Sequence, residues 1–462
     1  MKRRDFMKTA ALSAGALSIN RFLYADSPEA QRPNIVFVLA DDLGYGDLGC
    51  YGQKYVKTPN LDRMAAEGMK FTQFYSGSTV CAPSRCCLMT GLHTGHAFIR
   101  GNKEIQPEGQ YPIPPDTITI AKVLQKAGYK TGCIGKWGLG GPGSSGAPNQ
   151  QGFDYWYGYL CQRQAHRYYP SHLWENEAKI ELNGEKYSHD LMTEKAMQFL
   201  DENHKNPFFL YIPYTIPHAE LVVPEDSMKE YEGRFEEKPF GGAGNYGAQP
   251  SPKAAFAGMG SRLDRDMGRL LNKLKELGID DHTVVLFSSD NGPHKEGGHD
   301  PGFFDSNGPL RGIKRDLYEG GIRVPTIARW PGRISPGTVS DHIGAFWDMM
   351  PTFADLAGIE PPDGLDGVSF APLLRGNAEK QKTHKFLYWE FHERGFNQAV
   401  RMGEWKAVKT AADKPLELYN LNQDIGETRN IAKQNPNIVK QIESYLSTVR
   451  VESEIFPTKK GE

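Results

Sequence analysis

The chain has 462 residues, 39% of them hydrophobic and 24% charged, so it can bury a large core in one big α/β domain or in two to four domains. Its formal net charge of −2 excludes nucleic-acid binding through overall charge, so an anionic substrate must meet a local basic site. The six cysteines have no regular spacing, and neither a disulfide framework nor a zinc finger is expected.

Residues 1–25 have the features of an export signal and are not expected to belong to the fold. Arg3 and Arg4 lie in a twin-arginine sequence, a short apolar stretch follows at residues 9–19, and Ala25 ends a candidate cleavage site. The segment resembles a Tat signal, which implies export in the folded state. A disordered basic tail and a membrane anchor are the alternatives, but the apolar stretch is too short to span a bilayer.

Removal of this signal would leave 49 Lys and Arg residues against 55 Asp and Glu residues, a formal charge of −6. No run of 18 apolar residues occurs later in the chain, so stable membrane insertion is not expected. The predicted location is therefore the periplasm or the medium.

Four short apolar runs along the chain each lead into polar residues. They show little alternation, which is typical of parallel strands that are covered on both faces. The runs occupy residues 34–40, 130–135, 207–212 and 283–288. The polar residues that follow them are, in chain order, Asp41 and Asp42, Lys136, His218, and Asp290 and Asn291.

Helical patterns separate these runs. One helix is expected after Thr58 as its N-cap and should stop at Gly68, and others are predicted at residues 116–127, 190–203 and 256–277. Alternation of strands and helices indicates a doubly wound α/β sheet, in which sites form at the carboxyl ends of the strands. The polar clusters are therefore expected to share one active site.

The pattern changes after about residue 375. Short antiparallel strands are predicted at residues 385–390, 398–401, 405–409 and 416–419, with a closing helix at 438–450. We therefore expect a catalytic domain over residues 33–375 and a small α+β C-terminal subdomain over residues 385–455.

The most specific motif surrounds Cys81. Pro83 fits the first turn of a helix, which places Cys81 at a helix N-terminus, where backbone N–H groups favour an anion. Arg85 lies about one turn further on and can approach Cys81. The pattern indicates an activated cysteine nucleophile, and a buried cysteine that caps the helix is the alternative.

The sequence Cys-x-Pro-Ser-Arg from Cys81 to Arg85, followed by Leu-Met-Thr-Gly, resembles the signature of the type I sulfatases. The resemblance implies an alkaline-phosphatase-like α/β/α sandwich with a mostly parallel central sheet. It also implies that a maturation enzyme oxidises Cys81 to formylglycine. In that family one hydroxyl of the formylglycine hydrate attacks sulfur and expels the alcohol, and the other hydroxyl then releases sulfate.

The acidic residues point to a cation. Asp41, Asp42, Asp290 and Asn291 offer only oxygen ligands, which select a hard cation such as Ca²⁺ or Mg²⁺. An acidic pair at one strand end is more often a helix cap or a turn, but a second acidic group at another strand end favours a metal site. By resemblance, these four residues match the metal ligands of the family.

Three basic residues are assigned by the same resemblance. Lys136, in a Gly-Lys-Trp motif, would bridge the sulfate and the nucleophile, Lys314 would bind the sulfate, and Arg85 would hold the formylglycine. A solvated surface charge is the alternative for each of them.

Histidine supplies a pKa suited to a general acid near neutral pH. His218 matches the family histidine that protonates the leaving oxygen. The family often has a second histidine two residues after the motif lysine, but this chain has Gly138 there. His294 is the candidate replacement, with an ordinary loop histidine as the alternative.

Residues 152–176 are rich in aromatic side chains and also contain Arg163 and His166. Aromatic faces with polar donors suit sugar rings, and packing of a long loop against the core is an equal alternative. The segment and the resemblance favour a sulfated carbohydrate substrate of the galactose or N-acetylgalactosamine type. A phosphatase, a phosphonate monoester hydrolase and a non-catalytic carbohydrate-binding relative are the rival functions.

Overall fold

The computed structural model describes residues 32–393 and 395–458, so the predicted export signal lies outside the described residues. A ten-stranded sheet forms the centre, in the order β11-β2-β10-β9-β1-β8-β4-β5-β6-β7. Its five middle strands are mutually parallel. They are β9 (Thr283–Ser289), β1 (Asn34–Ala40), β8 (Phe208–Pro213), β4 (Lys130–Lys136) and β5 (Tyr155–Tyr159).

Antiparallel pairings occur toward both edges of this sheet, at β10 and at β6. On one side lie β10 (Thr326–Arg329), β2 (Met69–Phe71) and β11 (Thr338–Ser340), and on the other lie β6 (His172–Glu175) and β7 (Ala178–Glu181). The predicted α/β class with a mostly parallel sheet is therefore confirmed. The edge strands are short and were not predicted.

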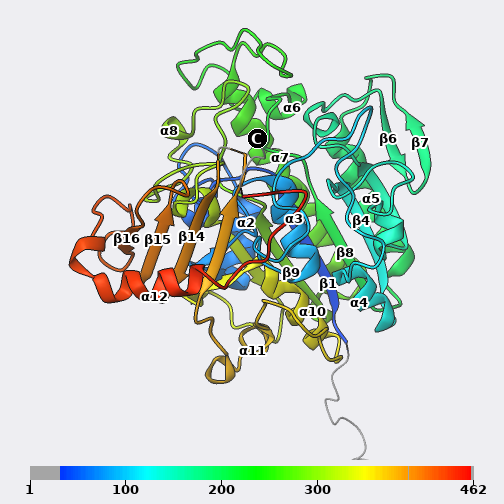
Figure 1. Ribbon diagram of the computed structural model, residues 1–462. Helices are drawn as coiled ribbons and strands as arrows, with labels where there is room; N and C mark the ends of the chain where they lie inside the picture. The colour runs from blue at the N-terminus through cyan, green and yellow to red at the C-terminus, as the bar shows by residue number, and fades with distance from the viewer. Residues whose placement is uncertain (1–31, 394, 459–462) are drawn as a thin grey trace, which may run out of the picture.

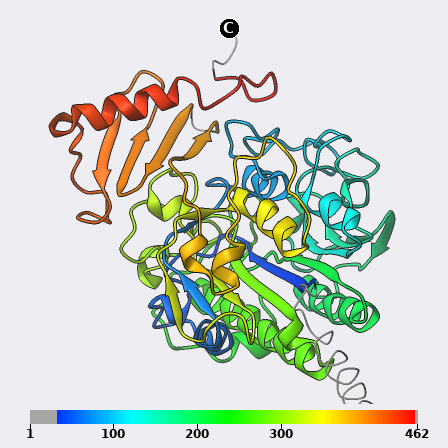
Figure 2. The same cartoon turned by 90° about the horizontal axis from the view of Figure 1, so that it is seen from below.

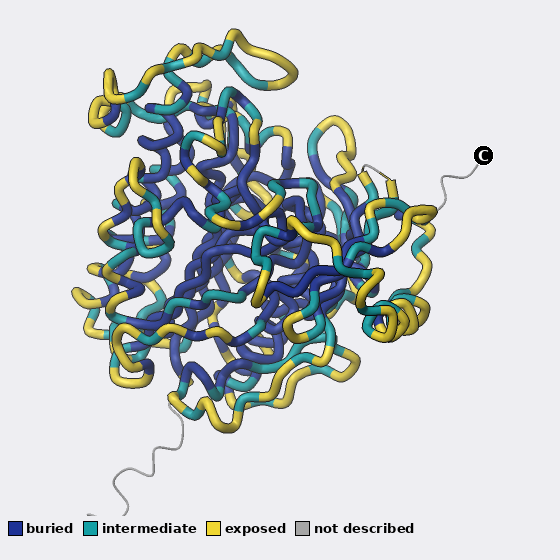
Figure 3. The backbone as a smooth tube through the Cα atoms, turned by 90° about the vertical axis from the view of Figure 1, so that its left-hand side faces the viewer, coloured by how far each residue is buried: buried dark blue, intermediate teal, exposed yellow. Residues whose placement is uncertain are grey.

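Helices cover both faces of the sheet, which explains why the strand runs are apolar throughout. Ile35, Phe37 and Leu39 of β1 belong to one core, whereas the alternate residues Val36 and Val38 belong to the other. The first core contains α3 (Cys81–Thr90), α4 (Ile120–Lys126) and α10 (Met349–Leu356). The second contains α2 (Pro59–Glu67), α5 (Ser188–Asn203) and α7 (Pro252–Glu276). Figure 3 shows the buried chain at the centre and the exposed chain in peripheral loops.

Several helix starts differ from the sequence predictions. α4 begins at Ile120, not at residue 116, because Thr119 is its N-cap and accepts a hydrogen bond from the Lys122 amide at 3.2 Å. Thr58 precedes α2 but does not cap it through its side chain. Its hydroxyl instead donates to Asp62 at 3.2 Å. The remaining short elements are β3 (Phe74–Tyr75), α6 (Glu225–Met228), α8 (Pro301–Phe304), α9 (Glu319–Ile322), β12 (Gly344–Ala345) and α11 (Ala371–Leu374).

A four-stranded antiparallel sheet follows the main body, on one side of it in Figure 1. It consists of β13 (Leu387–Phe391), β14 (Asn397–Met402), β15 (Trp405–Lys409) and β16 (Glu417–Asn420), and α12 (Pro436–Leu446) lies across it (Figure 2). Tyr388 and Val400 pack toward Ile442 of α12, whereas Trp389 and Ala399 join the core of the main body. Both faces of the small sheet are therefore covered.

A buried ion pair also ties this sheet to the main body. The Lys406 ammonium lies 2.9 Å from a carboxylate oxygen of Glu319, in α9, and neither side chain is exposed. Within the part of the chain that the structure describes, no helix is both long enough and apolar enough to cross a membrane.

Candidate active site

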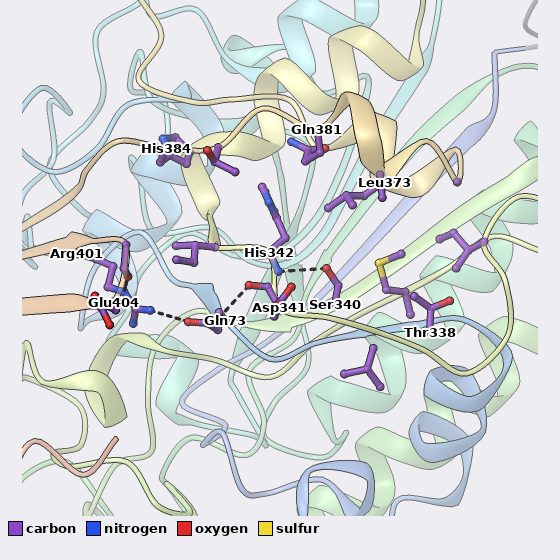
Figure 4. Close-up of a pocket in the computed structure, with 18 of the residues that line it drawn as sticks. Gln73, Thr338, Ser340, Asp341, His342, Leu373, Gln381, His384, Arg401 and Glu404 are labelled. Carbon is purple, nitrogen blue, oxygen red and sulfur yellow. Dashed lines mark hydrogen bonds between the residues drawn. The ribbon is translucent and has the colours of Figure 1, made fainter. Parts of the chain in front are cut away.

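The predicted site residues gather at a cavity of about 250 Å³. It is lined by five of them, namely Cys81, Arg163, His166, His218 and Lys314. A larger cavity of about 830 Å³ lies between β11 and the small sheet, and Figure 4 shows that polar residues such as His342 and Gln381 line it. The larger cavity holds no predicted site residue, so chemistry rather than size identifies the smaller one as the candidate active site.

The order of the strands in the sheet brings the polar clusters together. β9, β1, β8 and β4 are consecutive neighbours, and their carboxyl ends lie at one edge of the sheet. Asp41 and Asp42 follow β1, and Asp42 has a φ of 62°. This left-handed conformation ends the strand, so the two adjacent side chains need not point to opposite faces.

Three carboxylates converge at this edge. One oxygen from each of Asp41, Asp42 and Asp290 lies with the Cys81 sulfur in a group whose atoms are all within 4.8 Å of one another. The Asp42 amide donates to Asp290 Oδ1 at 3.1 Å, and Asn291 Nδ2 donates to Asp42 Oδ1 at 2.7 Å. Asn291 Oδ1 is buried and has no hydrogen-bond partner among the described residues.

Cys81 is the first residue of α3, as its motif predicts. Its Sγ lies 3.3 Å from Asp41 Oδ1 and 3.4 Å from Lys136 Nζ. Burial, and then the Asp41 carboxylate, raise the pKa of the Cys81 thiol well above its usual value. The unmodified side chain is therefore a protonated thiol, not a thiolate.

Each carboxylate is paired with one buried cation. Arg85 lies one turn after Cys81 in α3 and donates to Asp290 Oδ2 from Nη2 at 2.8 Å and from Nε at 3.1 Å. Lys136 Nζ lies 2.6 Å from Asp41 Oδ2. These two contacts connect the carboxyl ends of β9, β4 and β1.

Lys314 pairs with the third carboxylate, because its Nζ lies 2.6 Å from Asp42 Oδ2. Burial lowers the pKa of Lys314, but Asp42, Cys81 and Glu296 together outweigh burial and raise it well above the usual value. Glu296 lies nearby, with Oε2 3.7 Å from Lys314 Nζ. Sequence reasoning missed Glu296, although its position two residues after His294 was a signal.

His218 follows β8 and faces the same cluster. Its Nδ1 contacts the carbonyl of Ala219, so Nε2 is free to accept from Lys314 Nζ at 2.9 Å. Nε2 is also 3.2 Å from Asp42 Oδ2. Burial, and then the Lys314 ammonium, lower the pKa of His218 well below its usual value, so the imidazole is neutral. Tyr168 holds the loop by donating to the His218 carbonyl at 2.6 Å.

The imidazole of His218 lies between two other histidine rings. His166 stacks on it with ring centroids 4.4 Å apart and lines the cavity. His294 stacks on it at 5.3 Å but does not line the cavity. Its Nδ1 accepts from the Glu296 amide at 3.0 Å and its Nε2 contacts the Pro217 carbonyl at 3.3 Å. Because both nitrogens are engaged, this geometry favours a positioning role for His294 over direct proton donation.

Residues 152–176 divide between packing and the cavity. Most of their aromatic rings are buried in the two cores, including Phe153, Trp156 and Tyr168. The polar residues Gln162, Arg163 and His166 line the cavity, and the Arg163 guanidinium donates to Glu104 Oε1 at 2.6 Å. The aromatic residues of the segment thus pack mainly in the cores, and these three polar residues line the cavity.

Comparisons with known proteins identify the family of this chain. The model of the family named Sulfatase matches residues 33–359, and the model named N-sulphoglucosamine sulphohydrolase, C-terminal, matches residues 304–452. Human arylsulfatase A is 34% identical over 87% of this chain and 84% of its own. The N-acetylgalactosamine-6-sulfatase of Rattus norvegicus is 34% identical over 85% of this chain and 74% of its own.

A crystal structure of Ps i-CgsB has a similar fold, with a TM-score of 0.77 and 30% identity over 90% of this chain and 93% of that one. Ps i-CgsB has also been solved in complex with k-i-k-neocarrahexaose. These matches confirm the alkaline-phosphatase-like α/β/α fold expected from the sequence. The chain therefore belongs to the sulfatase family and is a sulfuric ester hydrolase.

Proposed function

We propose that this sulfatase hydrolyses a sulfate ester of a carbohydrate, with formylglycine made from Cys81 as its nucleophile. The observation that carries the proposal is the position of the Cys81 sulfur, which contacts both Asp41 and Lys136 at the point where the three carboxylates meet. The sulfur stands in for the oxygen of the modified side chain. A maturation enzyme would perform the oxidation during biosynthesis.

The chemistry of the donors fits a hard divalent cation, Ca²⁺ or Mg²⁺. Asp41, Asp42, Asp290 and Asn291 would hold it, and the unpartnered Oδ1 of Asn291 supports this assignment. When bound, the cation would hold a sulfate oxygen and favour deprotonation of the attacking hydroxyl.

The charges of the cluster support the same assignment. Three carboxylates face three cations, Arg85, Lys136 and Lys314, so the formal charges of these six protein groups cancel. A divalent cation would give the site a surplus of positive charge, which a sulfate ester complements. Although the net charge of the chain is negative, this local positive charge would attract the anionic substrate.

The chain's own residues take distinct roles in this proposal. Arg85 would hold Asp290 in place, Lys136 would contact both the nucleophile and the sulfate, and Lys314 would bind the sulfate. His218 lines the cavity, with its Nε2 next to Lys314. Its imidazole is neutral without substrate, so it would take up a proton when the negatively charged ester binds and then deliver that proton to the leaving oxygen. His294 would keep the His218 ring in place.

The carbohydrate assignment rests on the cavity wall and on the relatives. Arg163 and His166 line the cavity with polar groups, and we assign them to the sugar. The names of two similar proteins refer to N-acetylgalactosamine and to a bound neocarrahexaose, so a galactose or N-acetylgalactosamine unit is the proposed substrate. We further propose export to the periplasm or the medium, with a catalytic domain at 33–375 and a subdomain at 385–455.

The decisive experiment measures release of inorganic sulfate from sulfated galactose and N-acetylgalactosamine saccharides by protein made together with a maturation enzyme. Nitrophenyl sulfate and nitrophenyl phosphate are compared in parallel, and Cys81→Ala is the control variant. We expect saccharide hydrolysis, little phosphate release and no turnover by the variant. Faster hydrolysis of the phosphate ester would overturn the sulfatase chemistry, and turnover only of aryl sulfates would overturn the carbohydrate assignment.

A further inference from the structure

The second residue after Lys136 is Gly138, and the space beside it is filled by the side chain of Gln162. Gly138 has a φ of 86°, and a Cβ placed on it would lie 2.1 Å from Gln162 Nε2. Any other residue at position 138 would meet backbone strain and would displace the amide of Gln162. Glycine at this position therefore makes room for Gln162 in the active site.

The amide of Gln162 has no hydrogen-bond partner among the described residues. Its side chain is only 7% exposed and lines the same cavity as Cys81 and His218. Neither Nε2 nor Oε1 makes a hydrogen bond to any described residue. Gln110 lines the same cavity, and its Oε1 is also buried without a partner. Because a buried polar group without a partner is costly, such groups in an active site point to a ligand that completes them.

The unpartnered atoms specify the kind of ligand group. Gln162 offers an NH2 donor group and a carbonyl acceptor, and Gln110 offers a second acceptor. Sulfate oxygens only accept hydrogen bonds, so a sulfate group would leave both acceptors unpaired. A hydroxyl group both donates and accepts, and a sugar carries several of them. Nitrophenyl sulfate carries none.

We infer that Gln162 and Gln110 form a subsite that binds hydroxyl groups of the sugar that carries the sulfate, and so select saccharide sulfates over aryl or steroid sulfates. This inference rests on the proposed function and adds two residues that determine its substrate specificity. An amide does not ionise near neutral pH, so Gln162 binds the substrate but does not supply the leaving group with a proton. Proton donation remains with His218.

The test compares Gln162→Leu with the wild-type enzyme on the best saccharide sulfate of the panel and on nitrophenyl sulfate. We expect the kcat/KM for the saccharide sulfate, divided by that for nitrophenyl sulfate, to fall by about tenfold. The main cause should be a higher KM for the saccharide. Gln198→Leu, an exposed residue of α5, is the matched control and should leave the ratio unchanged. Thermal melting of both variants checks that the fold is intact.

A second arm uses deoxy substrates, first with the wild-type enzyme and then with Gln162→Leu or, if that variant does not fold, with Gln110→Leu. Monodeoxy analogues of the saccharide sulfate are assayed with the wild-type enzyme, and loss of at least one hydroxyl should lower kcat/KM by about tenfold. With Gln162→Leu, the kcat/KM for that same analogue should be nearly equal to the kcat/KM for the parent saccharide sulfate.

Two outcomes would refute the inference: equal losses on saccharide and aryl esters, or deoxy analogues that all react like the parent. If the wild-type enzyme hydrolyses aryl sulfates well but no saccharide sulfate, the carbohydrate assignment itself is at fault. These results are distinguishable. The subsite inference can be refuted only if the enzyme hydrolyses a saccharide sulfate, whereas the carbohydrate assignment fails if it hydrolyses none.

Discussion

The substitution Asp290→Asn tests the proposed cation site through stability, independently of turnover. Asp290 is fully buried. It accepts two hydrogen bonds from Arg85 and one from the Asp42 amide. Asparagine has the same shape, but it removes one negative charge and replaces a carboxylate oxygen with an amide NH2 group, which cannot bind a cation. The quantity to measure is the gain in stability on adding Ca²⁺ to chelator-treated protein, so any change in the metal-free protein cancels.

The expected magnitude follows from mass action. A ligand present at 100 times its Kd stabilises the folded state by about 2.7 kcal/mol. Loss of an outer-sphere partner commonly weakens metal binding by roughly 10- to 100-fold, and loss of a direct ligand should reach at least the upper value. At the same Ca²⁺ concentration, the variant would then gain only about 0.4 kcal/mol.

The assay is thermal or denaturant unfolding of wild-type and variant protein over a range of Ca²⁺ and Mg²⁺ concentrations. Asp305→Asn is the matched control, because Asp305 is exposed and has a φ of 52°, which asparagine tolerates. It should keep the full stabilisation by Ca²⁺. If Asp290→Asn responds to the cation as strongly as the wild-type protein does, the cation binds elsewhere and the ligand assignment is wrong.

Three further predictions concern other parts of the site and the fold. Peptide mass spectrometry should find formylglycine at residue 81 in active protein, and Cys81→Ala should abolish turnover with little change in melting temperature; full activity from unmodified Cys81 would contradict the nucleophile. His218→Ala should lower kcat for saccharide sulfates by about 10²- to 10⁴-fold and lower it less for nitrophenyl sulfate, whose leaving group is already acidic. Equal losses would assign His218 to binding. Lys406→Met should reduce the free energy of unfolding by about 3 kcal/mol, because it removes a buried ammonium that pairs with the buried carboxylates of Glu319 and Glu427. Lys409→Met, on the same strand, should cost far less, and similar values for the two would show that the buried pair adds nothing.

Four of the five parallel strands could be predicted closely from the sequence, whereas β5 lies in a segment that was interpreted as a loop. The run at 34–40 coincides with β1, and the runs that predicted β4, β8 and β9 end within one residue of the observed strands. Such runs are readable because strands covered on both faces need apolar side chains at every position. The strand β2 and the edge strand β11 have three residues each, and their pairing depends on neighbours that are distant in the sequence.

The chemical identity of the site was likewise visible in the sequence. Cys81 and Arg85 form a local motif on one helix, so their spacing along the chain determines their spacing in space. The acidic pair at Asp41 and Asp42 was visible too, but its convergence with Asp290 depends on β1 and β9 being neighbours in the sheet. Strand order is a property of the tertiary fold and cannot be read from any one segment.

The directions of side chains in the loops were decided by the tertiary structure alone. His294 and His166 were both candidates, but packing places His294 behind His218 and His166 at the cavity. The sequence showed that Gly138 lacks a side chain, and only the fold showed that Gln162 occupies its place. The side chains of a loop are oriented by contacts with segments that are far away in the chain. The sequence therefore determined which chemical groups were available, and three-dimensional packing determined which of them line the cavity.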